Sequence, residues 1–492
     1  MSEHGAIPDE PSIFDDDEEA TGHGVVRIAS VAALGGLLFG YDSAVINGAV
    51  SAIEDNYDIH GQALGFAVAA VLLGAAAGAM SAGRFADRFG RLFVMKVASV
   101  LFLISAFGAG LVDNLWLFIL FRVIGGAGVG IASVIAPAYI AEISPARIRG
   151  RLGSLQQLAI VSGIFLSLLI DFLLAQAAGG SKEELWLGLE AWRWMFIVMA
   201  VPAVAYGLLA LTIPESPRYL VARHKIPEAR KVLTALLGER NLEIKINRIR
   251  ETLKREKPPS WGDLRAPGGT FLLPIVWVGV LLSVFQQAVG INVIFYYSNV
   301  LWEAVGFSED GSFVITVITS IVNVATTIIA IALVDKIGRK PLLLIGSAGM
   351  TVTLATMAII FQTASLDADG KPELTGVTGP IALIAANLFV VAFGMSWGPV
   401  VWVLLGEMFP NRIRAAALSL AAAAQWVANW VITVSFPELK DISLGLAYGI
   451  YGVSALLSFL FVMRFVRETK GVTLEDMHDD LAPLPTPPAV PH

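Results

Sequence analysis

The sequence predicts an all-α membrane protein of twelve transmembrane helices in two six-helix bundles, with short cytoplasmic linker helices between the bundles. Three observations support this prediction. The chain contains 56% hydrophobic and only 15% charged residues, whereas a soluble protein carries about 25% charged residues. Apolar stretches close to the roughly 20 residues that cross a hydrocarbon core recur from end to end. The charged motifs that follow some of these stretches occur in both halves of the chain.

The apolar stretches define the expected elements in order. The twelve helices are expected at about 25–50, 61–83, 92–112, 115–141, 152–174, 192–213, 271–301, 312–334, 341–363, 380–409, 413–436 and 442–466. The corresponding regions are a disordered acidic N-terminal tail at 1–24, a bundle at 25–213, a cytoplasmic linker with short helices at 214–270, a bundle at 271–466 and a cytoplasmic C-terminal tail at 467–492.

The distribution of the 34 Lys and Arg residues predicts the orientation. Nearly all of them lie in the amino terminus, the even-numbered returns between helices or the carboxyl tail, whereas Lys182, Lys371 and Lys440 lie in the opposite loops. Cytoplasmic loops carry the excess of basic residues, so we expect both termini to be cytoplasmic. The acidic run Asp15–Glu19 does not fit the basic start of a signal peptide. The chain has no cysteine, which excludes disulfides and thiolate metal sites.

Two charged motifs are found in each half. Asp87-Arg-Phe-Gly-Arg91 follows the second helix, and Asp335-Lys-Ile-Gly-Arg339 follows the eighth. Glu142-Ile-Ser-Pro-Ala-Arg-Ile-Arg149 follows the fourth helix, and Glu407-Met-Phe-Pro-Asn-Arg-Ile-Arg414 follows the tenth. Parallel repeats of this kind place a substrate site between the halves, near the bilayer midplane.

These motifs resemble those of the major facilitator superfamily. Pro214-Glu-Ser-Pro-Arg-Tyr-Leu220, Gln286-Gln287, Gly290-Ile-Asn292 and Arg467-Glu-Thr-Lys-Gly471 narrow the resemblance to the sugar porter family. That family includes bacterial proton-coupled glucose and xylose symporters and animal glucose facilitators. The resemblance covers about residues 25–475. It implies the major facilitator fold and a transporter of a small neutral monosaccharide.

The cytoplasmic charges have two interpretations. They give the inner helix ends their positive-inside character, or they pair across the two bundles and close the cytoplasmic side in one state of the transporter. Exposed pairs contribute only about 0–1 kcal/mol each, so several would have to act together. The resemblance implies such an inner gate, formed by Asp87, Arg88, Arg91, Glu142, Arg149, Asp335, Arg339, Glu407 and Arg414.

The polar side chains inside the predicted helices are mostly amides, which suit a polyol because each can donate and accept hydrogen bonds. An indole face suits the C–H side of a sugar ring, whereas an anionic substrate would require several intramembrane cations. For any single amide, hydrogen bonding between helices is the alternative. The resemblance implies that the sugar contacts are Gln157, Gln286, Gln287, Asn292, Asn323, Trp402, Gln425 and Trp426, with weaker matches at Phe39 and Asn429.

Helix breaks are expected beside this set. Gly290 should interrupt the seventh helix just before Asn292, and Gly398-Pro399 should interrupt the tenth just before Trp402. Interrupted helices at matching places of a repeat point to a transport site. The glycine-rich segment Gly125–Gly130 resembles a dinucleotide loop, but no strand precedes it, so it indicates close helix packing.

Asp42 and Arg122 are predicted to be the one acid and the one base deep in the membrane. Counting 1.5 Å per residue places Asp42 about 8 Å and Arg122 about 12 Å below the outer surface. The proton affinity of a buried carboxylate depends on its desolvation and on nearby cations. We therefore expect Asp42 and Arg122 to couple a proton to transport, the alternative being a fixed structural ion pair. The resemblance favours coupling, since proton symporters of the family carry Asp at this place and the animal uniporters carry Asn.

The resulting hypothesis is a proton-coupled symporter that imports a neutral monosaccharide by alternating access. We expect glucose to be preferred, with xylose or a related hexose as the alternative. An uncoupled sugar uniporter, a sugar-sensing receptor and a drug/proton antiporter are the competing hypotheses. The sequence shows no catalytic residues, metal ligands or cofactor motif, so an enzyme is not expected. The expected partners are the sugar, a proton and the lipid bilayer of the cell membrane, with no nucleic acid and a functional monomer.

Overall fold

The computed structural model describes residues 22–144, 146–237, 242–255, 264–265, 272–366, 372–409 and 413–469. Nineteen helices and four short strands lie in these residues. They include 12 spans that are long and apolar enough to cross a membrane, which confirms the predicted fold class. Most of the two expected tails lies outside the described residues. The chain divides into two compact units, Met1–Lys257 with Glu309–Ser320, and Pro258–Ser308 with Ile321–His492.

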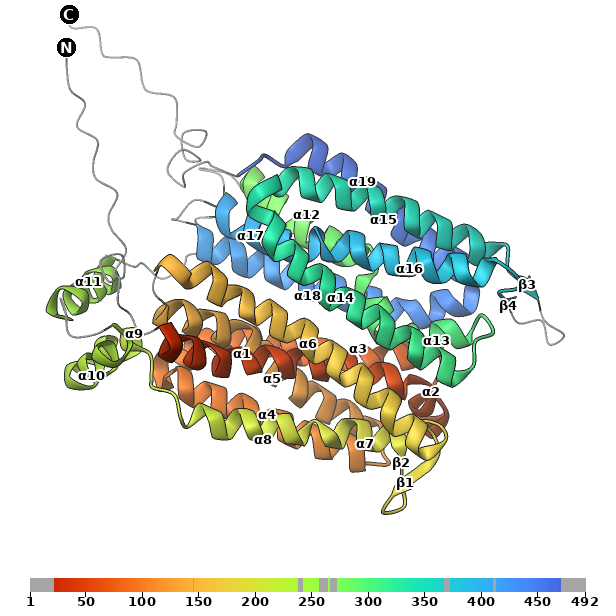
Figure 1. Ribbon diagram of the computed structural model, residues 1–492, viewed down its shortest axis with the longest axis horizontal. Coiled ribbons are helices and arrows are strands. Elements are labelled where there is room, and N and C mark those ends of the chain that lie inside the picture. Colours follow the sequence, from red (N-terminus) through yellow and green to blue (C-terminus); the bar gives the residue numbers. More distant parts are fainter. Residues whose placement is uncertain are drawn as a thin grey trace, which may run out of the picture. The chain divides into compact units, whose positions relative to one another are not determined.

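The first unit contains the first six spans, several of which are longer than the sequence predicted (Figure 1). Two of the spans are broken: α1 and α2 are separated at Val45, and α7 and α8 at Met199. A short hairpin precedes α7. The elements are α1 (Gly22–Ala44), α2 (Ile46–Tyr57), α3 (Gly61–Phe89), α4 (Arg91–Leu111), α5 (Leu115–Ile143), α6 (Ala146–Ala178), β1 (Glu184–Trp186), β2 (Leu189–Glu190), α7 (Ala191–Val198) and α8 (Ala200–Ala210).

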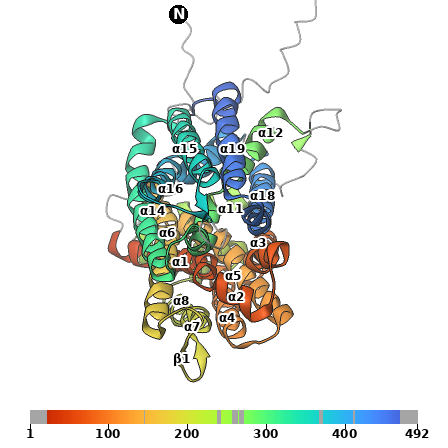
Figure 2. The same ribbon diagram turned by 90° about the vertical axis from the view of Figure 1, so that its right-hand side faces the viewer.

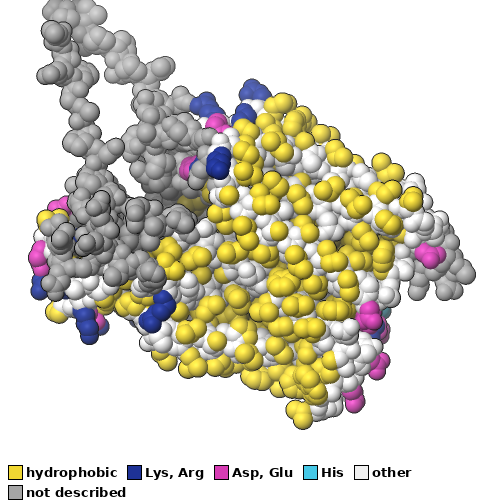
Figure 3. All heavy atoms as spheres, in the orientation of Figure 1, with side chains coloured by type: hydrophobic (Ala, Val, Ile, Leu, Met, Phe, Trp, Pro, Cys, Tyr) yellow, Lys and Arg dark blue, Asp and Glu magenta, His cyan; other side chains and the backbone are white. Residues whose placement is uncertain are grey.

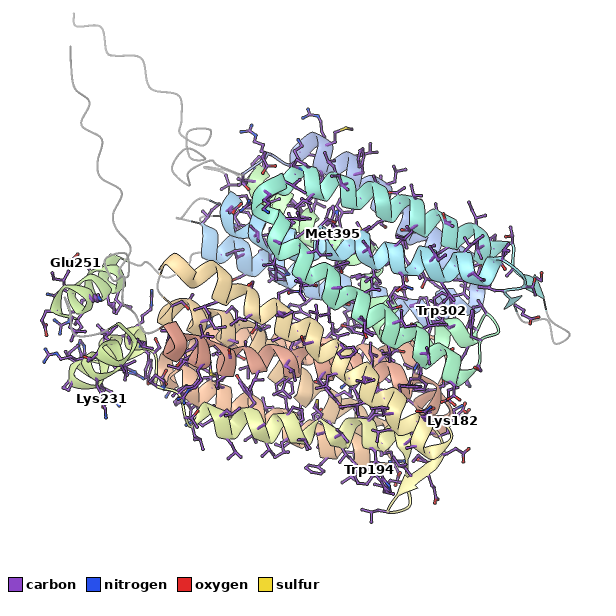
Figure 4. All side chains as sticks on the ribbon, viewed as in Figure 1. Lys182, Trp194, Lys231, Glu251, Trp302 and Met395 are labelled. Atoms are coloured by element: carbon purple, nitrogen blue, oxygen red, sulfur yellow. The ribbon has the colours of Figure 1, made fainter. Side chains whose placement is uncertain are left out.

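Three short helices follow this bundle, as the sequence predicted for the linker. They are α9 (Pro217–Ala222), α10 (Ile226–Leu237) and α11 (Leu242–Arg255). Figure 4 shows Lys231 and Glu251 on these helices, at the end of the first unit opposite Lys182 and Trp194.

The second unit repeats the arrangement, with two further broken spans formed by α12 with α13 and by α16 with α17. Its elements are α12 (Pro274–Ala288), α13 (Ile291–Glu303), α14 (Glu309–Ile337), α15 (Arg339–Gln362), β3 (Ser365–Leu366), β4 (Pro372–Glu373), α16 (Thr378–Gly394), α17 (Trp397–Met408), α18 (Arg414–Ile442) and α19 (Leu444–Phe465). The first part of α14 groups with the first unit.

The surface matches a lipid environment. Figure 3 shows hydrophobic side chains over most of the displayed face, with charged side chains near its ends. The hydrophobic side chains of Val100, Met80 and Leu208 are all more than half exposed. In lipid, every backbone polar group must be satisfied within the protein, and a helix achieves this along its own length.

Close helix crossings hold the first unit together, and glycine makes them possible. In α5, a Cβ added at Gly126 or Gly130 would overlap the carbonyl oxygen of Val71 or Ala75 in α3. Small residues allow such backbone approach between membrane helices. The prediction that the glycine-rich segment packs helices is therefore confirmed.

One predicted helix break is confirmed and the other lies elsewhere. Gly290 has φ +80° and separates α12 from α13. A side chain there would be strained by this φ, and its Cβ would lie 2.6 Å from the ring of Tyr451. The break in the tenth span lies at Met395–Ser396, not at Gly398-Pro399. Pro399 falls in the first turn of α17, where a missing N–H costs no helical hydrogen bond.

Candidate functional site

The predicted pairing of Asp42 with Arg122 is confirmed. Arg122, in α5, donates from Nη1 to Asp42 Oδ1 at 2.6 Å and from Nη2 to the Asp42 carbonyl oxygen at 3.1 Å. Both side chains have no exposed surface. Figures 1 and 2 show α1 and α5, which carry the pair, side by side within the first unit.

Neither member of the pair is fully hydrogen-bonded. Within the described residues, Asp42 Oδ2 and Arg122 Nε have no hydrogen-bond partner, and neither has the nearby hydroxyl of Ser105. The guanidinium lies 5.4 Å from the ring centroid of Phe196. Room for the carboxylate depends on Gly125, where an added Cβ would lie 2.8 Å from Asp42 Oδ2. Burying an ion pair whose donors and acceptors are not all hydrogen-bonded costs stability. Breaking the pair costs more, because removing one partner leaves an uncompensated buried charge.

Asp42 is not the only deeply buried acid, so that part of the sequence prediction is wrong. Asp171, near the end of α6, also has no exposed surface. Arg193, in the first turn of α7, pairs with Asp113 at 2.7 Å and with Glu190 at 2.7 Å. The sequence interpretation assigned no role to Asp171, which lies close to the end of the helix expected at about 152–174. The structure shows that α6 continues for seven residues beyond it, to Ala178.

The charged motifs form the same contact in both units. Arg91, at the start of α4, donates from Nε and Nη2 to the carboxylate of Glu142 at 3.0 and 2.8 Å. Arg339, at the start of α15, donates from Nε and Nη2 to Glu407 at 3.0 and 2.7 Å. Asp87 lies 3.2 Å from Arg91. These forked pairs lie within one unit each, and pairing across the units stays a prediction.

The remaining gate residues are described only in part. Arg88 stacks on the ring of Phe89 at 5.2 Å from its centroid. The side chains of three members of the predicted gate lie outside the described residues. These three are Arg149, Asp335 and Arg414.

Two further glutamates were recognised in the sequence only as parts of motifs, and the structure gives them a contact. Glu215 accepts hydrogen bonds from the backbone N–H groups of Arg91 and Leu92 at 3.0 and 3.2 Å. Glu468 does the same for Arg339 and Lys340, at 3.0 Å each. Each glutamate therefore satisfies two free N–H groups at a helix N-terminus, where negative charge is favoured.

The glycine of each Asp-x-x-Gly-Arg motif makes this contact possible. Gly90 and Gly338 have φ values of +100° and +103°. An added Cβ at Gly338 would lie 2.7 Å from Glu468 Oε2, and one at Gly90 would overlap Glu215 Oε2. The motif thus binds the segment that follows the sixth or the twelfth span.

Three of the predicted sugar contacts gather at the helix breaks of the second unit. Gln286 donates from Nε2 to the carbonyl oxygens of Trp397 and Gly398, at 2.9 and 3.2 Å, in the first turn of α17. Asn292 donates to Gln287 Oε1 at 2.6 Å, across the break between α12 and α13. Gln286 Oε1 has no partner among the described residues, so it offers a free acceptor.

The other predicted contacts are more dispersed. In α18, Asn429 accepts a hydrogen bond from Thr433 at 3.1 Å, and Gln425 Oε1 has no partner in the described part of the chain. Trp402, one of the predicted sugar contacts, is 44% exposed. Trp426, Gln157 and Phe39 are partly buried, and Asn323 is buried.

Comparison with known proteins decides the family. The family of sugar (and other) transporters matches residues 28–481. The chain belongs to this sugar transporter family. A glucose transport protein of Synechocystis sp. is 55% identical over 92% of this chain and 97% of that protein. A D-xylose-proton symporter of Escherichia coli is 38% identical over 92% of this chain and 95% of that protein.

The fold comparison agrees with the family. The inward-open structure of the xylose transporter XylE from E. coli matches with a TM-score of 0.78 and 37% identity, over 92% of this chain and 99% of that chain. The protein is therefore a membrane transporter of the major facilitator superfamily and not an enzyme. Within the described residues, no group of three His, Cys, Asp or Glu side chains could hold a metal ion.

Proposed function

We propose that this protein is a proton-coupled symporter that imports a neutral monosaccharide, with glucose preferred. The observation that carries the proposal is the Asp42–Arg122 pair, which is fully buried inside a member of a sugar transporter family. The glucose transport protein at 55% identity supports glucose, and the D-xylose-proton symporter at 38% identity supports coupling.

The proposed coupling follows from the geometry of the pair. In the structure Arg122 holds one carboxylate oxygen of Asp42, and the other oxygen has no partner among the described residues. Protonation of Asp42 would remove the charge that holds the guanidinium. The loaded carrier then turns inward, and loss of the proton to the cytoplasm restores the pair. The ion pair is thus the two-state element that proton binding biases.

The proposed sugar site uses the amides of the second unit. Gln286 presents an unpaired acceptor from α12, and Gln425 presents another from α18. Sugar hydroxyls both donate and accept, so amide side chains can satisfy them in either role. Gln157 and Phe39 would contribute from the first unit. The proposed gate closes the cytoplasmic end in one state.

The remaining parts of the proposal concern location. We place the protein in the cell membrane with both termini in the cytoplasm, because the Lys and Arg excess lies on that side. The proposed working unit is a monomer, since one chain contains both halves of the pathway.

Proton flux in proteoliposomes tests the coupling. Adding glucose to vesicles that contain the wild-type protein should alkalinise the external medium as protons enter with the sugar. Asp42→Asn keeps the size of the side chain and removes its charge, so sugar-induced proton flux and accumulation should be lost while glucose exchange continues. Unchanged proton flux in this variant contradicts the proposal and favours a fixed ion pair. Absence of proton flux in the wild type indicates a uniporter.

A panel of sugars tests the substrate. Uptake of radiolabelled glucose is competed with xylose, arabinose and galactose, with and without an imposed pH gradient. Glucose should compete best, and an inward-directed proton gradient should raise the level of accumulation. Preferential competition by xylose would contradict the assignment to glucose and leave the class of substrate intact.

A further inference from the structure

A second buried carboxyl group in the first unit has no role in the mechanism above. Asp171 has no exposed surface, and neither of its carboxylate oxygens has a hydrogen-bond partner among the described residues. The backbone of Gly48 approaches the carboxylate without reaching hydrogen-bond geometry. Asp171 therefore differs from Asp42, whose charge Arg122 balances.

Glycine makes room for this carboxyl group. A Cβ added at Gly48, in α2, would lie 2.8 Å from Asp171 Oδ2 and 2.8 Å from the sulfur of Met195, in α7. Tyr41 also faces Asp171, but its hydroxyl donates to the carbonyl oxygen of Met195 at 3.3 Å. The phenol proton is thus already engaged elsewhere. Asp171 is enclosed by α1, α2 and α7, which lie near α6 in Figures 1 and 2.

The carboxyl group belongs to the face of α6 that packs against the first span. Gly40 lies against the backbone of Ile160 and Ile164, and Gly48 lies against Asp171. Ser167, one turn before Asp171 on the same helix face, is also fully buried, and its hydroxyl has no partner within the described residues. Gly48 follows Asp42 by six residues, so Asp171 lies about 9 Å further along the span.

Within the part of the chain that the structure describes, no Lys or Arg side chain pairs with Asp171. Of the charged groups on the helices that pack against α6, Arg122 pairs with Asp42, and Arg193 pairs with Glu190 and Asp113. The titratable group that faces the carboxyl is the phenol of Tyr41. Burying an unpaired carboxylate costs several kcal/mol, whereas the neutral acid avoids most of that cost. The arrangement therefore requires a proton on Asp171.

Two helix breaks allow the cover over Asp171 to move. The α2 segment begins after the break at Val45, three residues before Gly48. The α7 segment ends at the break at Met199, four residues after Met195. Each covering segment is thus a separate half-helix, and hinges of this kind absorb the backbone changes of a conformational switch.

We propose that Asp171 is a second proton-binding site, whose neutral form keeps α2 and α7 closed over α6. Ionisation of Asp171 requires water and therefore favours separation of these half-helices. This assignment does not require that Asp42 carries the coupled proton. Failure of the coupling test above and failure of the tests below are consequently distinguishable.

Infrared spectroscopy of the wild-type transporter in vesicles tests the protonation directly. At neutral pH, the spectrum should contain the carbonyl stretch of a buried neutral carboxylic acid. Asp171→Asn should remove this band, whereas Asp42→Asn should retain it because Asp42 is ion-paired in this state. Asp171→Ala provides the same comparison if the Asn variant does not fold. A wild-type spectrum without the band, or a band that persists in both Asp171 variants, overturns the proposal.

Thiol labelling tests the link between the proton and the closed half-helices. The chain has no cysteine, so Ala49→Cys introduces a single thiol, at a fully buried position of α2. Labelling by an external reagent should rise with pH faster in this variant than in Ala49→Cys combined with Asp171→Asn. The ratio should grow by up to about tenfold per pH unit, because separation releases one proton. The double variant corrects for the pH dependence of the thiol itself. An equal rise in both proteins overturns the proposal.

Discussion

The membrane interiors of the two units contain different kinds of polar groups. The first unit buries two acids and a base within its spans, namely Asp42, Asp171 and Arg122. In the described residues of the second unit, the acidic and basic side chains lie only near the ends of the spans, and the buried polar groups away from those ends are amides and hydroxyls. The proposed energy coupling and most of the proposed sugar contacts therefore occupy different units, although the two units contain the same charged sequence motifs.

The units also differ in how their helices approach one another. In the first unit, several glycines lie directly against a backbone carbonyl oxygen of a neighbouring helix, as Gly40, Gly74 and Gly126 do. In the second unit, the closest atoms to an added Cβ belong to side chains, such as Phe409 at Gly279 and Thr326 at Gly394. Close backbone contact leaves little freedom for adjustment, whereas side chains can change rotamer. The first unit therefore has the stiffer interior.

Removing the base of the first unit should have the largest effect. Arg122→Met leaves Asp42 buried without its ion-pair partner, and breaking such a pair costs about 3–5 kcal/mol. We expect a marked fall in thermal stability together with loss of sugar accumulation. A partial recovery of stability in Arg122→Met combined with Asp42→Asn would identify the uncompensated charge as the cause. Normal accumulation in the single variant contradicts the role of the pair.

Closing the glycine contact in α5 should have the next largest effect. Gly126→Ala places a methyl group against the carbonyl oxygen of Val71, and such overpacking costs about 1–3 kcal/mol. Gly449→Ala, in α19, is the matched control, because no atom lies within 4 Å of its added Cβ. The control should be neutral or slightly stabilised, since Ala favours helix more than Gly. Equal melting temperatures for the two variants would contradict the proposed difference in stiffness between the units.

Removing an amide side chain of the second unit should weaken sugar binding and leave proton coupling unchanged. Gln286→Ala removes the donor to Trp397 and Gly398 and the free acceptor. Losing one or two hydrogen bonds to a sugar costs about 1–3 kcal/mol, so KM should rise about 5- to 150-fold. The number of protons moved per sugar should not change. A changed ratio of protons to sugar would show that coupling is not confined to the first unit.

The sequence was sufficient for the fold because its information is local. Twelve apolar stretches and their charge bias predict twelve spans, and the repeated motifs divide them equally. The pairing of Asp42 with Arg122 also followed from one-dimensional reasoning, since both depths can be counted along straight helices. These predictions need only helix geometry and the thickness of the bilayer.

The features that the sequence did not predict depend on contacts between distant segments. Asp171 lies near the end of an apolar stretch, and its burial depends on Gly48 and Met195, which belong to other helices. The break expected at Gly398-Pro399 lies earlier, because Pro399 falls in the first turn of α17, where proline does not interrupt a helix. The exposure of Trp402 depends on the rotation of α17, which the sequence does not determine.

The variants with the smallest expected effect test a feature that the two units share. Glu215→Gln and Glu468→Gln each replace a carboxylate that accepts two backbone N–H groups at a helix start. A Gln side chain has one acceptor oxygen, so each variant should lose about 1 kcal/mol of stability. Glu228→Gln is the control, because its contact with Lys225, at 3.6 Å, joins two exposed side chains and contributes little. Similar losses in thermal stability for Glu215→Gln and Glu468→Gln, beyond that of the control, would show that the units stabilise the starts of α4 and α15 in the same way. A loss in only one of them would extend the difference between the units from the membrane interior to its edge.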